Sequence, residues 1–237
     1  MSAPARALAI ALIALAGLLA GFLAYRVATP NAALRASSAD ATHAATAQPS
    51  AAEALDAAAA AAKPLPSMLP DVRLPNLANQ SVGLHDFLGQ PLIINFWATW
   101  CAPCRREMPL LQQLRHDFKA DRLQIVGVAV DFEAAVRDYL KSHAVDYPVL
   151  IGESQGLGAI EQFGLEPVLP VSVFADAQGR IIAAKIGELH RAEADFILGQ
   201  MRAIAAGRVS LEAGRAAIAA QLKALAIERA KAGDQSS

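Results

Sequence analysis

The chain has 237 residues, of which 54% are hydrophobic and 18% are charged, and its formal net charge at pH 7 is −1. A charge so close to zero gives no reason to expect binding to nucleic acid or to an anionic membrane surface. The chain contains only two cysteines, which excludes a framework of several disulfides. The residues beyond position 68 are numerous enough to form one domain with its own hydrophobic core.

The first predicted element is an apolar segment close to the N-terminus. Residues 7–25 carry no charge and are bounded by Arg6 and Arg26. A helix of about 19 residues can cross the hydrocarbon core of a membrane. A cleaved signal peptide has a shorter apolar region followed by a small-x-small site, and this pattern does not match it well. We therefore expect residues 1–27 to be an uncleaved transmembrane anchor, whose orientation the flanking arginines do not fix.

The segment that follows is rich in alanine, serine and threonine. Residues 28–68 contain few large apolar side chains, so they cannot bury enough apolar surface to fold alone. Alanine favours a helix over residues 51–62, but this stretch has no apolar face with which to dock. We expect residues 28–68 to be a flexible tether that ends in a proline-rich stretch.

The hydrophobic pattern beyond the tether predicts one α/β domain over residues 69–206 and a helical extension over residues 207–237. Residues 92–97 are apolar on both faces, which is typical of a buried central strand. The expected strands cover residues 72–74, 81–84, 92–97, 123–130, 171–175 and 181–186, with a short segment at 147–151. The expected helices cover residues 103–120, 132–143 with Asp131 as N-cap, 156–163, 191–205 and 210–231. The last helix either packs on the domain or serves a partner, and the pattern does not decide.

Both cysteines lie where the central strand meets the first helix. Cys101 and Cys104 are separated by two residues, and a strand that delivers such a pair onto a helix N-terminus is typical of a thioredoxin-like redox site. The free N–H groups and the dipole at that end of a helix favour a thiolate at Cys101, which is the attacking species in thiol–disulfide exchange. Cys104 lies one turn further on, so its sulfur can resolve a mixed disulfide. Pro103 suits the first helical turn, where its missing N–H costs nothing.

Two structural interpretations of the cysteine pair are less favourable. A disulfide that closes so short a loop adds little stability. A structural zinc site needs four ligands, and the sequence holds neither a second cysteine pair nor a histidine pair with metal-ligand spacing. We therefore expect no metal and no other cofactor.

Residues 95–109 read Asn-Phe-Trp-Ala-Thr-Trp-Cys-Ala-Pro-Cys-Arg-Arg-Glu-Met-Pro, and they closely resemble the TlpA/ResA-like branch of the thioredoxin superfamily. The resemblance extends over roughly residues 69–201, judged by element order. It implies a thioredoxin-like α/β fold, with a central mixed sheet flanked by helices, behind the N-terminal transmembrane anchor. It also implies a thiol–disulfide oxidoreductase of the bacterial cell envelope, with its catalytic domain outside the cytoplasm.

The resemblance also assigns the residues that would contact a substrate. Pro170, just before a predicted strand, matches the cis-proline that faces the cysteines and shapes the substrate groove, and Pro167 is the rival position. Leu169 would then present its backbone to a bound substrate strand. We expect Trp100 and Pro103 to contribute contact surface beside the attacking sulfur.

Glu107 is the third catalytic candidate. It lies three residues after Cys104, so on a helix it projects near the same turn, and the related proteins carry a functional glutamate at this motif position. A partly buried carboxylate there can tune the thiol pKa and accept a proton, whereas a solvated acid would only interact with the helix dipole. Thioredoxin has a buried aspartate at the position of Asn95. Because an amide cannot relay a proton, we expect Glu107 or water to take that role.

These features predict a periplasmic, membrane-anchored reductant with Cys101, Cys104 and Glu107 as catalytic residues. The Ala-Pro dipeptide between the cysteines resembles that of reducing relatives more than that of strong oxidants. The resemblance implies a single pass through the inner membrane and a membrane electron donor of the DsbD or CcdA type. It also suggests disulfide-containing protein clients, such as those of cytochrome c maturation or of copper-site assembly in an oxidase.

Two functions of other classes stay open at this point. A Sco-like copper-binding assembly factor resembles this fold but uses a Cys-x-x-x-Cys pair, one residue longer than the spacing here, plus a distant histidine. A copper titration of the reduced protein would identify it. A peroxiredoxin also shares the fold, but its peroxidatic cysteine lies in a different motif, and a peroxidase assay would identify it.

Overall fold

The computed structural model describes residues 65–234. The predicted anchor over residues 1–27 lies outside them, and so does the predicted tether as far as residue 64. Within the described residues, no helix is both long enough and apolar enough to span a membrane. The anchor therefore stays a prediction.

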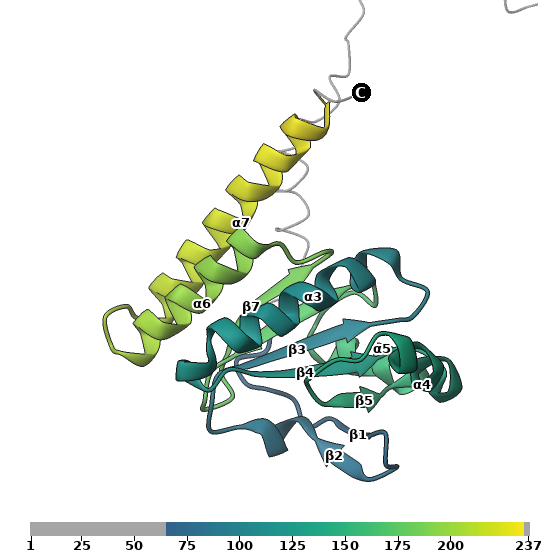
Figure 1. Cartoon of the computed structure of the whole chain (residues 1–237). Coiled ribbons are helices and arrows are strands. Elements are labelled where there is room, and N and C mark those ends of the chain that lie inside the picture. The colour runs from purple at the N-terminus through teal and green to yellow at the C-terminus, as the bar shows by residue number, and fades with distance from the viewer. Residues whose placement is uncertain (1–64, 235–237) are drawn as a thin grey trace, which may run out of the picture. The chain divides into compact units, whose positions relative to one another are not determined.

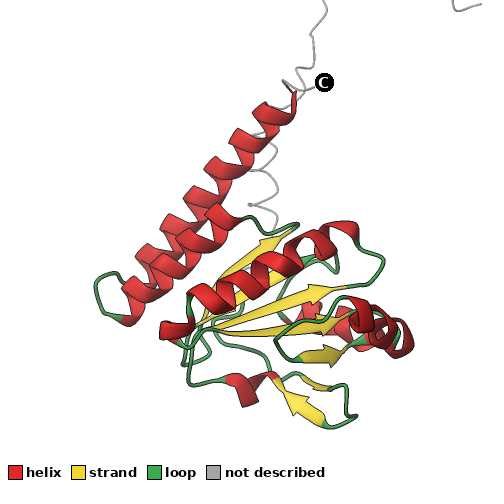
Figure 2. Ribbon diagram, viewed as in Figure 1, coloured by secondary structure: helices red, strands yellow, loops and turns green. Residues whose placement is uncertain are grey.

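A five-stranded mixed sheet forms the centre of the domain (Figures 1 and 2). Its strand order is β5-β4-β3-β6-β7. The first three of these strands are parallel to one another, whereas β6 is antiparallel to β3 and to β7. The strands are β3 (Leu92–Trp97), β4 (Gln124–Ala129), β5 (Val149–Ile151), β6 (Val171–Ala175) and β7 (Ile181–Ile186). The predicted bounds of the last two strands are confirmed.

The central strand β3 supplies both hydrophobic cores. All six of its residues are buried, and such a strand must be covered on both faces. Successive side chains of a strand point to opposite faces, so Ile93 and Trp97 join one core while Ile94 and Phe96 join the other. The mostly apolar run in the sequence, in which only Asn95 is polar, reflects this burial on both faces.

Helices cover both faces of the sheet (Figure 1). The core around Trp97 is completed by α3 (Ala102–Asp117), α4 (Glu133–Ser142), α6 (Arg191–Ala205) and α7 (Leu211–Asp234). The core around Phe96 is completed by α5 (Glu153–Gln162) and by the hairpin of β1 (Arg73–Pro75) and β2 (Ser81–Gly83). Two short 3-10 helices, η2 (Leu84–Phe87) and η3 (Lys119–Asp121), follow β2 and α3. This is the predicted thioredoxin-like α/β arrangement.

The prediction that Asp131 caps the helix after β4 is wrong. The N-cap of α4 is Phe132, and the N–H of Glu133, the first residue of the helix, donates to Glu153 Oε1 at 3.2 Å. One carboxylate oxygen of Asp131 accepts hydrogen bonds from the backbone N–H and the hydroxyl of Thr99, and the other accepts the N–H of Phe132. The carboxylate is thus engaged by the loop before the cysteines, which lies 32 residues earlier in the chain.

The prediction that the next helix begins at residue 156 is also wrong, because α5 begins at Glu153. A glycine often marks a helix boundary in a sequence, but Gly156 lies within the helix. A Cβ at this position would lie 2.9 Å from Cγ2 of Val130. Glycine is therefore required here by the close approach of α5 to the end of β4.

The C-terminal helix α7 packs on the domain, antiparallel to α6 and beside β7 (Figure 1). Ile218 is buried in the core on this side of the sheet. Arg215 donates hydrogen bonds from Nε, at 3.0 Å, and from its terminal nitrogen to the carbonyl of Ile181. A Cβ on Gly214 would lie 2.6 Å from Cδ1 of Ile204, so a glycine at this position lets the two helices approach closely. The sequence left two alternatives for the C-terminal extension, packing on the domain or contact with a partner. The structure shows packing on the domain.

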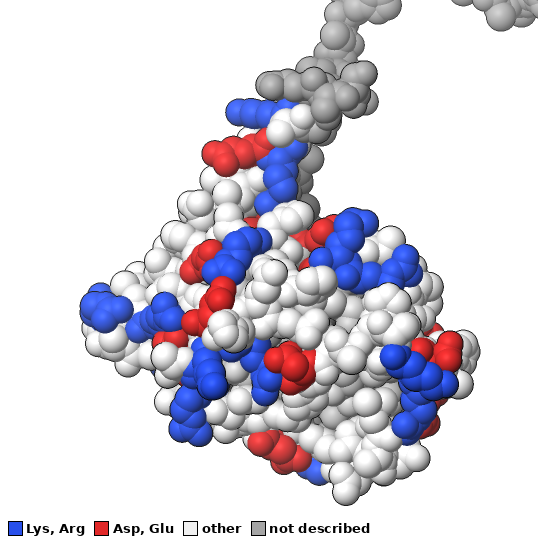
Figure 3. Space-filling model, viewed as in Figure 1, with Lys and Arg blue, Asp and Glu red and all other residues white. Residues whose placement is uncertain are grey.

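Charges of both signs are interspersed on the face seen in Figure 3. Several form ion pairs between elements: Arg191 of α6 lies 2.7 Å from Asp117 of α3, and Arg202 of α6 pairs with Asp121 of η3. Such exposed pairs contribute little stability each. They join α6 to α3 and to η3, the short helix that follows α3.

Candidate active site

The two cysteines lie where β3 passes into α3. They are joined by a disulfide, so the structure shows the oxidised form of the pair. Cys101 is the N-cap of α3, and its sulfur accepts the backbone N–H of Cys104 at 3.3 Å. Pro103 lies in the first turn of the helix, as predicted. Free N–H groups at a helix N-terminus stabilise a thiolate more than a thiol, so this geometry favours ionisation of Cys101 after reduction.

The two sulfurs differ in their access to solvent. Cys101 is 5% exposed, whereas Cys104 is fully buried. The greater exposure of Cys101 agrees with its assignment as the attacking residue and with that of Cys104 as the resolving one. The exposure of Cys101 is nevertheless small, so a client must bring its disulfide into close contact with the surface around it.

The loop before Cys101 is held by polar contacts on two sides. The N–H of Thr99 donates to Asp131 Oδ2 at 3.0 Å, and the carbonyl of Thr99 accepts from Arg105 at 2.6 Å. These contacts leave the neighbouring Trp100 with 67% of its surface exposed. The indole is therefore accessible to another molecule, and its contact with a client stays a prediction.

The proline predicted to be cis is cis in the structure: the peptide bond is Leu169–Pro170. β6 begins at the next residue, and Val171 pairs with Phe96 near the end of β3. This register brings Pro170 to the same end of the sheet as the cysteines. Among the described residues, no backbone hydrogen bond outside helices and strands uses the N–H or C=O of Leu169. Both groups are free to pair with an extended peptide.

A groove of about 620 Å³ is lined by the residues that directly precede Cys101 and Pro170 in the chain. Trp100 and Leu169 line it, together with three further apolar side chains that are well exposed: Phe132, Leu157 and Val168. Phe132 alone is 75% exposed. Exposed apolar side chains that line one groove are typical of a surface that binds another molecule. A larger pocket of about 820 Å³ includes Pro91 and Leu123, at the opposite ends of β3 and β4. The smaller groove is the one lined by the residues that directly precede Cys101 and Pro170 in the chain.

Glu107 is buried behind the disulfide on the same helix. It is only 1% exposed, although a charged residue in the second turn of a helix is usually solvated. Its Oε1 accepts a hydrogen bond from Asn95 Nδ2 at 2.7 Å, and its Oε2 accepts the N–H of Leu189 at 2.6 Å. Asn95 Nδ2 also donates to Ser172 Oγ on the neighbouring strand at 3.1 Å. The interpretation of Glu107 as a solvated acid is thereby excluded, and Asn95 orients the carboxylate.

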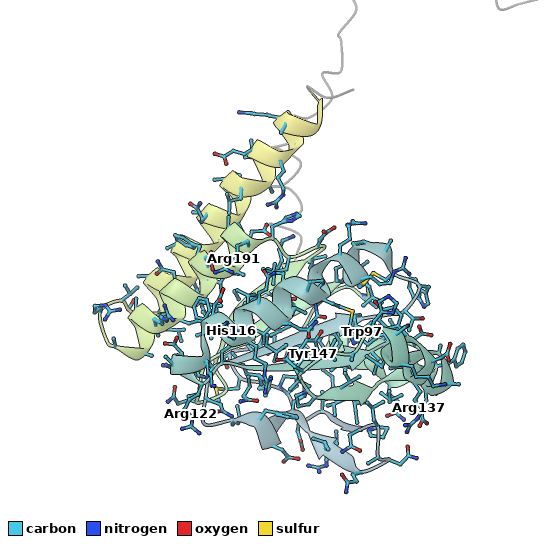
Figure 4. The ribbon with its side chains drawn as sticks, in the orientation of Figure 1. Trp97, His116, Arg122, Arg137, Tyr147 and Arg191 are labelled. Atoms are coloured by element: carbon cyan, nitrogen blue, oxygen red, sulfur yellow. A yellow bond between two sulfur atoms is a disulfide. The ribbon has the colours of Figure 1, made fainter. Side chains whose placement is uncertain are left out.

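Burial raises the pKa of Glu107 to about 7, although the hydrogen bonds from Leu189 and Asn95 act in the opposite direction. The carboxyl is thus poised to gain or lose a proton near neutral pH. Burial also raises the pKa of Tyr147, and the nearby Glu107 adds to this effect. Tyr147 and Trp97, both labelled in Figure 4, come within 3.2 and 3.1 Å of the point that a Cβ on Gly127 would occupy. They help to enclose this side of the sheet around the carboxylate.

The raised pKa of Glu107 makes the stability of the oxidised protein dependent on pH. The folded pKa of about 7 exceeds the ordinary value of 4.5, so between these values the folded state binds more protons than the unfolded state. Stability is therefore expected to fall as pH rises, by about 3 kcal/mol from this group alone. Urea unfolding of the wild type and of Glu107→Gln at pH 5 and at pH 8 measures the effect. The wild type should lose more stability than the variant between the two conditions, and equal losses would contradict the assignment.

Sequence reasoning missed the segment of residues 187–190, which lies against the site. The N–H of Gly187 donates to the carbonyl of Pro170 at 2.8 Å. Glu188 forms an ion pair of 2.5 Å with Arg106 of α3, and Leu189 binds Glu107. Because these contacts join positions as many as 82 residues apart, no local pattern in the sequence marks them.

The histidines do not form a cluster with the cysteines. Among the described residues, no group of three or more His, Cys, Asp or Glu side chains is arranged to hold a metal ion. His85 Nε2 lies 2.9 Å from the carbonyl of Leu69, and His190 is the N-cap residue of α6. Each of these two histidines therefore has a structural position.

A redox-active Cys-x-x-Cys pair at the N-terminus of a helix, with a cis-proline at the same end of a mixed sheet, defines a thioredoxin-like thiol–disulfide oxidoreductase. Comparison with known proteins agrees with this class. The AhpC/TSA family model matches residues 66–184, and the chain belongs to that family.

Individual relatives place the chain among named oxidoreductases. It is 31% identical over 120 residues to thiol-disulfide oxidoreductase ResA of Bacillus thuringiensis (strain Al Hakam), a match that covers 50% of this chain and 68% of the relative. It is 37% identical over 94 residues to the thioredoxin-like protein YneN of Bacillus subtilis (strain 168), covering 38% of this chain and 54% of the relative. A solved structure described as a thiol:disulfide interchange protein DsbE from Chlorobium tepidum is similar, with a TM-score of 0.53 at 25% identity, covering 59% of this chain and 96% of that one.

Proposed function

We propose that this oxidoreductase acts as a reductant of protein disulfides, with Cys101 as nucleophile, Cys104 as resolving thiol and Glu107 as proton acceptor. The observation that carries the proposal is the buried Glu107, one turn beyond Cys104 and hydrogen-bonded on both carboxylate oxygens. A proton acceptor with a pKa of about 7 suits the deprotonation of the fully buried thiol of Cys104.

The reaction transfers two electrons from the chain to its client. The thiolate of Cys101 attacks one sulfur of the client disulfide, and the other client sulfur leaves as a thiolate that takes a proton from solvent. Cys104 then gives its proton to the Glu107 carboxylate and attacks the sulfur of Cys101. The mixed disulfide breaks, the second client sulfur leaves as a thiolate, and the Cys101–Cys104 disulfide remains. Glu107 returns its proton when a donor dithiol reduces the pair again.

The groove beside the disulfide supports a protein client. Its exposed side chains include Trp100 and Val168, which suit an apolar segment next to the client cysteine. The backbone of Leu169, which has no backbone partner within residues 65–234, suits a short stretch of extended chain, because backbone pairing does not depend on the client's side chains. The surface is therefore suited to partly unfolded proteins that expose a disulfide.

The cellular setting of the proposal comes from the sequence. Residues 1–27 would anchor the chain in the inner membrane by a single pass, and residues 28–68 would tether the catalytic domain in the periplasm. There the pair would be oxidised by each client and would need electrons from a membrane donor of the DsbD or CcdA type. Clients in cytochrome c maturation or in copper-site assembly of an oxidase fit this setting, because both need reduced cysteine pairs.

The reduction potential of the pair tests the reducing direction. The negative charge of a carboxylate buried behind the cysteines makes a thiolate at either cysteine less favourable. The reduced form of the pair is therefore not strongly stabilised. We therefore expect a potential nearer to that of thioredoxin, about −270 mV, than to that of DsbA, about −120 mV. Equilibration of the protein with dithiothreitol and glutathione redox buffers, followed by thiol alkylation and mass measurement, gives the value. A potential near that of DsbA would show that the pair is an oxidant.

A further inference from the structure

A buried carboxylate, Glu193, connects the C-terminal helix to the rest of the domain. Its side chain is 0% exposed, and Oε1 lies 2.5 Å from a terminal nitrogen of Arg229 in α7. Nζ of Lys185 in β7 lies 3.8 Å from the same oxygen. The other oxygen accepts the backbone N–H of His190 at 3.0 Å, at the start of α6. A buried carboxylate needs such partners because an unpaired charge in the interior is costly, so α7 supplies a partner that the domain requires.

His190, whose N–H donates to Glu193, is the last residue of the segment of residues 187–190. Every residue of this segment makes a contact with another part of the domain. Gly187 bonds to Pro170, Glu188 pairs with Arg106, and Leu189 bonds to Glu107. The N–H groups of Leu189 and His190 are thus adjacent donors to two buried carboxylates, Glu107 and Glu193. The two N–H groups lie in consecutive peptide units that meet at the Cα of Leu189, so only the φ and ψ of that residue separate a displacement of one donor from the other.

We propose that Arg229 is a positioning residue of the redox site: by holding Glu193 it fixes the segment of residues 187–190, and thereby the N–H group that Leu189 donates to Glu107. The inference rests on the proposed function, since it matters only if Glu107 exchanges protons with the cysteine pair. Arg229 and the whole of α7 lie beyond residues 66–184, which the family model matches. In this proposal the C-terminal helix α7 adjusts the active site through Glu193.

The charged and titratable groups that face Glu107 come from several elements. Glu188 raises the pKa of Glu107, Lys185 lowers it, and the N–H of Leu189 lowers it more than Lys185 does. Tyr147 lies on the β5 side, and the cysteine pair lies one turn earlier on α3. Loss of the Leu189 hydrogen bond would remove a stabilising contact from the carboxylate. A looser segment is therefore expected to raise the pKa of Glu107.

Infrared difference spectroscopy of the full chain tests the proposal. The C=O stretch of protonated Glu107 is identified as the band absent from Glu107→Gln, and its pH midpoint is followed. Arg229→Met is expected to raise that midpoint by about half a unit to one unit, because part of a hydrogen bond to a charged group is lost. Lys185 still faces Glu193 in this variant, so the carboxylate keeps one cationic neighbour.

Two matched variants control for charge and for packing. Lys231→Met removes the same charge from an exposed position of the same helix and should leave the midpoint unchanged. Arg229→Lys keeps a charge beside Glu193 and should bring the midpoint back towards that of the wild type. A midpoint in Arg229→Met equal to that of the wild type would overturn the proposal, even if the variant unfolds at a lower temperature. If the wild type shows no titration of Glu107 near pH 7, the proposed function fails at Glu107, and this inference fails with it.

Discussion

Replacing Cys101 by serine is expected to lower the rate of protein-disulfide reduction by about 10³-fold or more, because a hydroxyl does not form the attacking anion at neutral pH. Cys101 is the N-cap of α3 and the more exposed of the two cysteines, so no other sulfur can take its place. Cys104→Ser is the matched control, since it changes the same atom at the buried position. The rate of insulin reduction under a supply of dithiothreitol measures both variants. Substantial activity in Cys101→Ser would reverse the assigned roles.

Cys104→Ser should retain the first attack and fail at the second. Serine cannot resolve the mixed disulfide, so the variant should accumulate a covalent complex with its client instead of releasing reduced product. Rapid alkylation of the reduced wild type provides a related observation, in which Cys101 is expected to react before Cys104. Preferential labelling of Cys104 would contradict the exposures and the cap geometry of the pair.

Glu107→Gln is expected to slow disulfide reduction near pH 7 by about 10²-fold while the fold stays intact. The amide cannot accept a proton from Cys104, and the rate inflection associated with a pKa of about 7 should disappear. In the wild type the carboxylate form increases as pH rises through this value, so the rate should rise with it. At high pH the thiol ionises without help, and the two proteins should converge. Single-turnover rates over a range of pH measure the difference.

A matched control separates the chemistry of Glu107 from a general change of charge. Glu161→Gln makes the same substitution at an exposed position of α5, on the opposite face of the sheet. It should leave the rate and its pH profile unchanged. If Glu107→Gln also shows the wild-type profile, Glu107 has no part in proton transfer and only the cysteines carry the reaction.

The core of the site could be predicted from the sequence because its geometry is local. The apolar run of β3 and the cysteine spacing fix where the pair lies, since only the short loop of residues 98–101 separates the strand from the helix. Glu107 follows Cys104 by one helical turn, so its side of the helix was also predictable. The family resemblance implied a cis-proline, the start of the next strand favoured Pro170 over Pro167, and the cis peptide bond of Pro170 agrees with the expectation.

The burial and the partners of Glu107 could not be predicted in the same way. A glutamate near the start of a helix is usually solvated, and nothing in its neighbouring residues shows that Leu189, 82 positions later, closes over it. The contact between Arg229 and Glu193 joins two helices 36 positions apart, and hydrophobic periodicity does not report on polar pairs. The same limit explains the error at Asp131, whose carboxylate binds the loop at Thr99 instead of capping the next helix.

The most direct test of the central claim is to map the covalent complex that Cys104→Ser forms with a disulfide-bonded protein. The complex is digested without reduction, and the cross-linked peptides are identified by mass spectrometry. The mechanism predicts that the chain contributes Cys101 to the bond, that the client contributes a cysteine from one of its own disulfides, and that Cys101→Ser forms no such complex. A Cys104→Ser protein that leaves the client disulfide intact and forms no mixed disulfide would contradict the assignment of this chain as a protein-disulfide reductant.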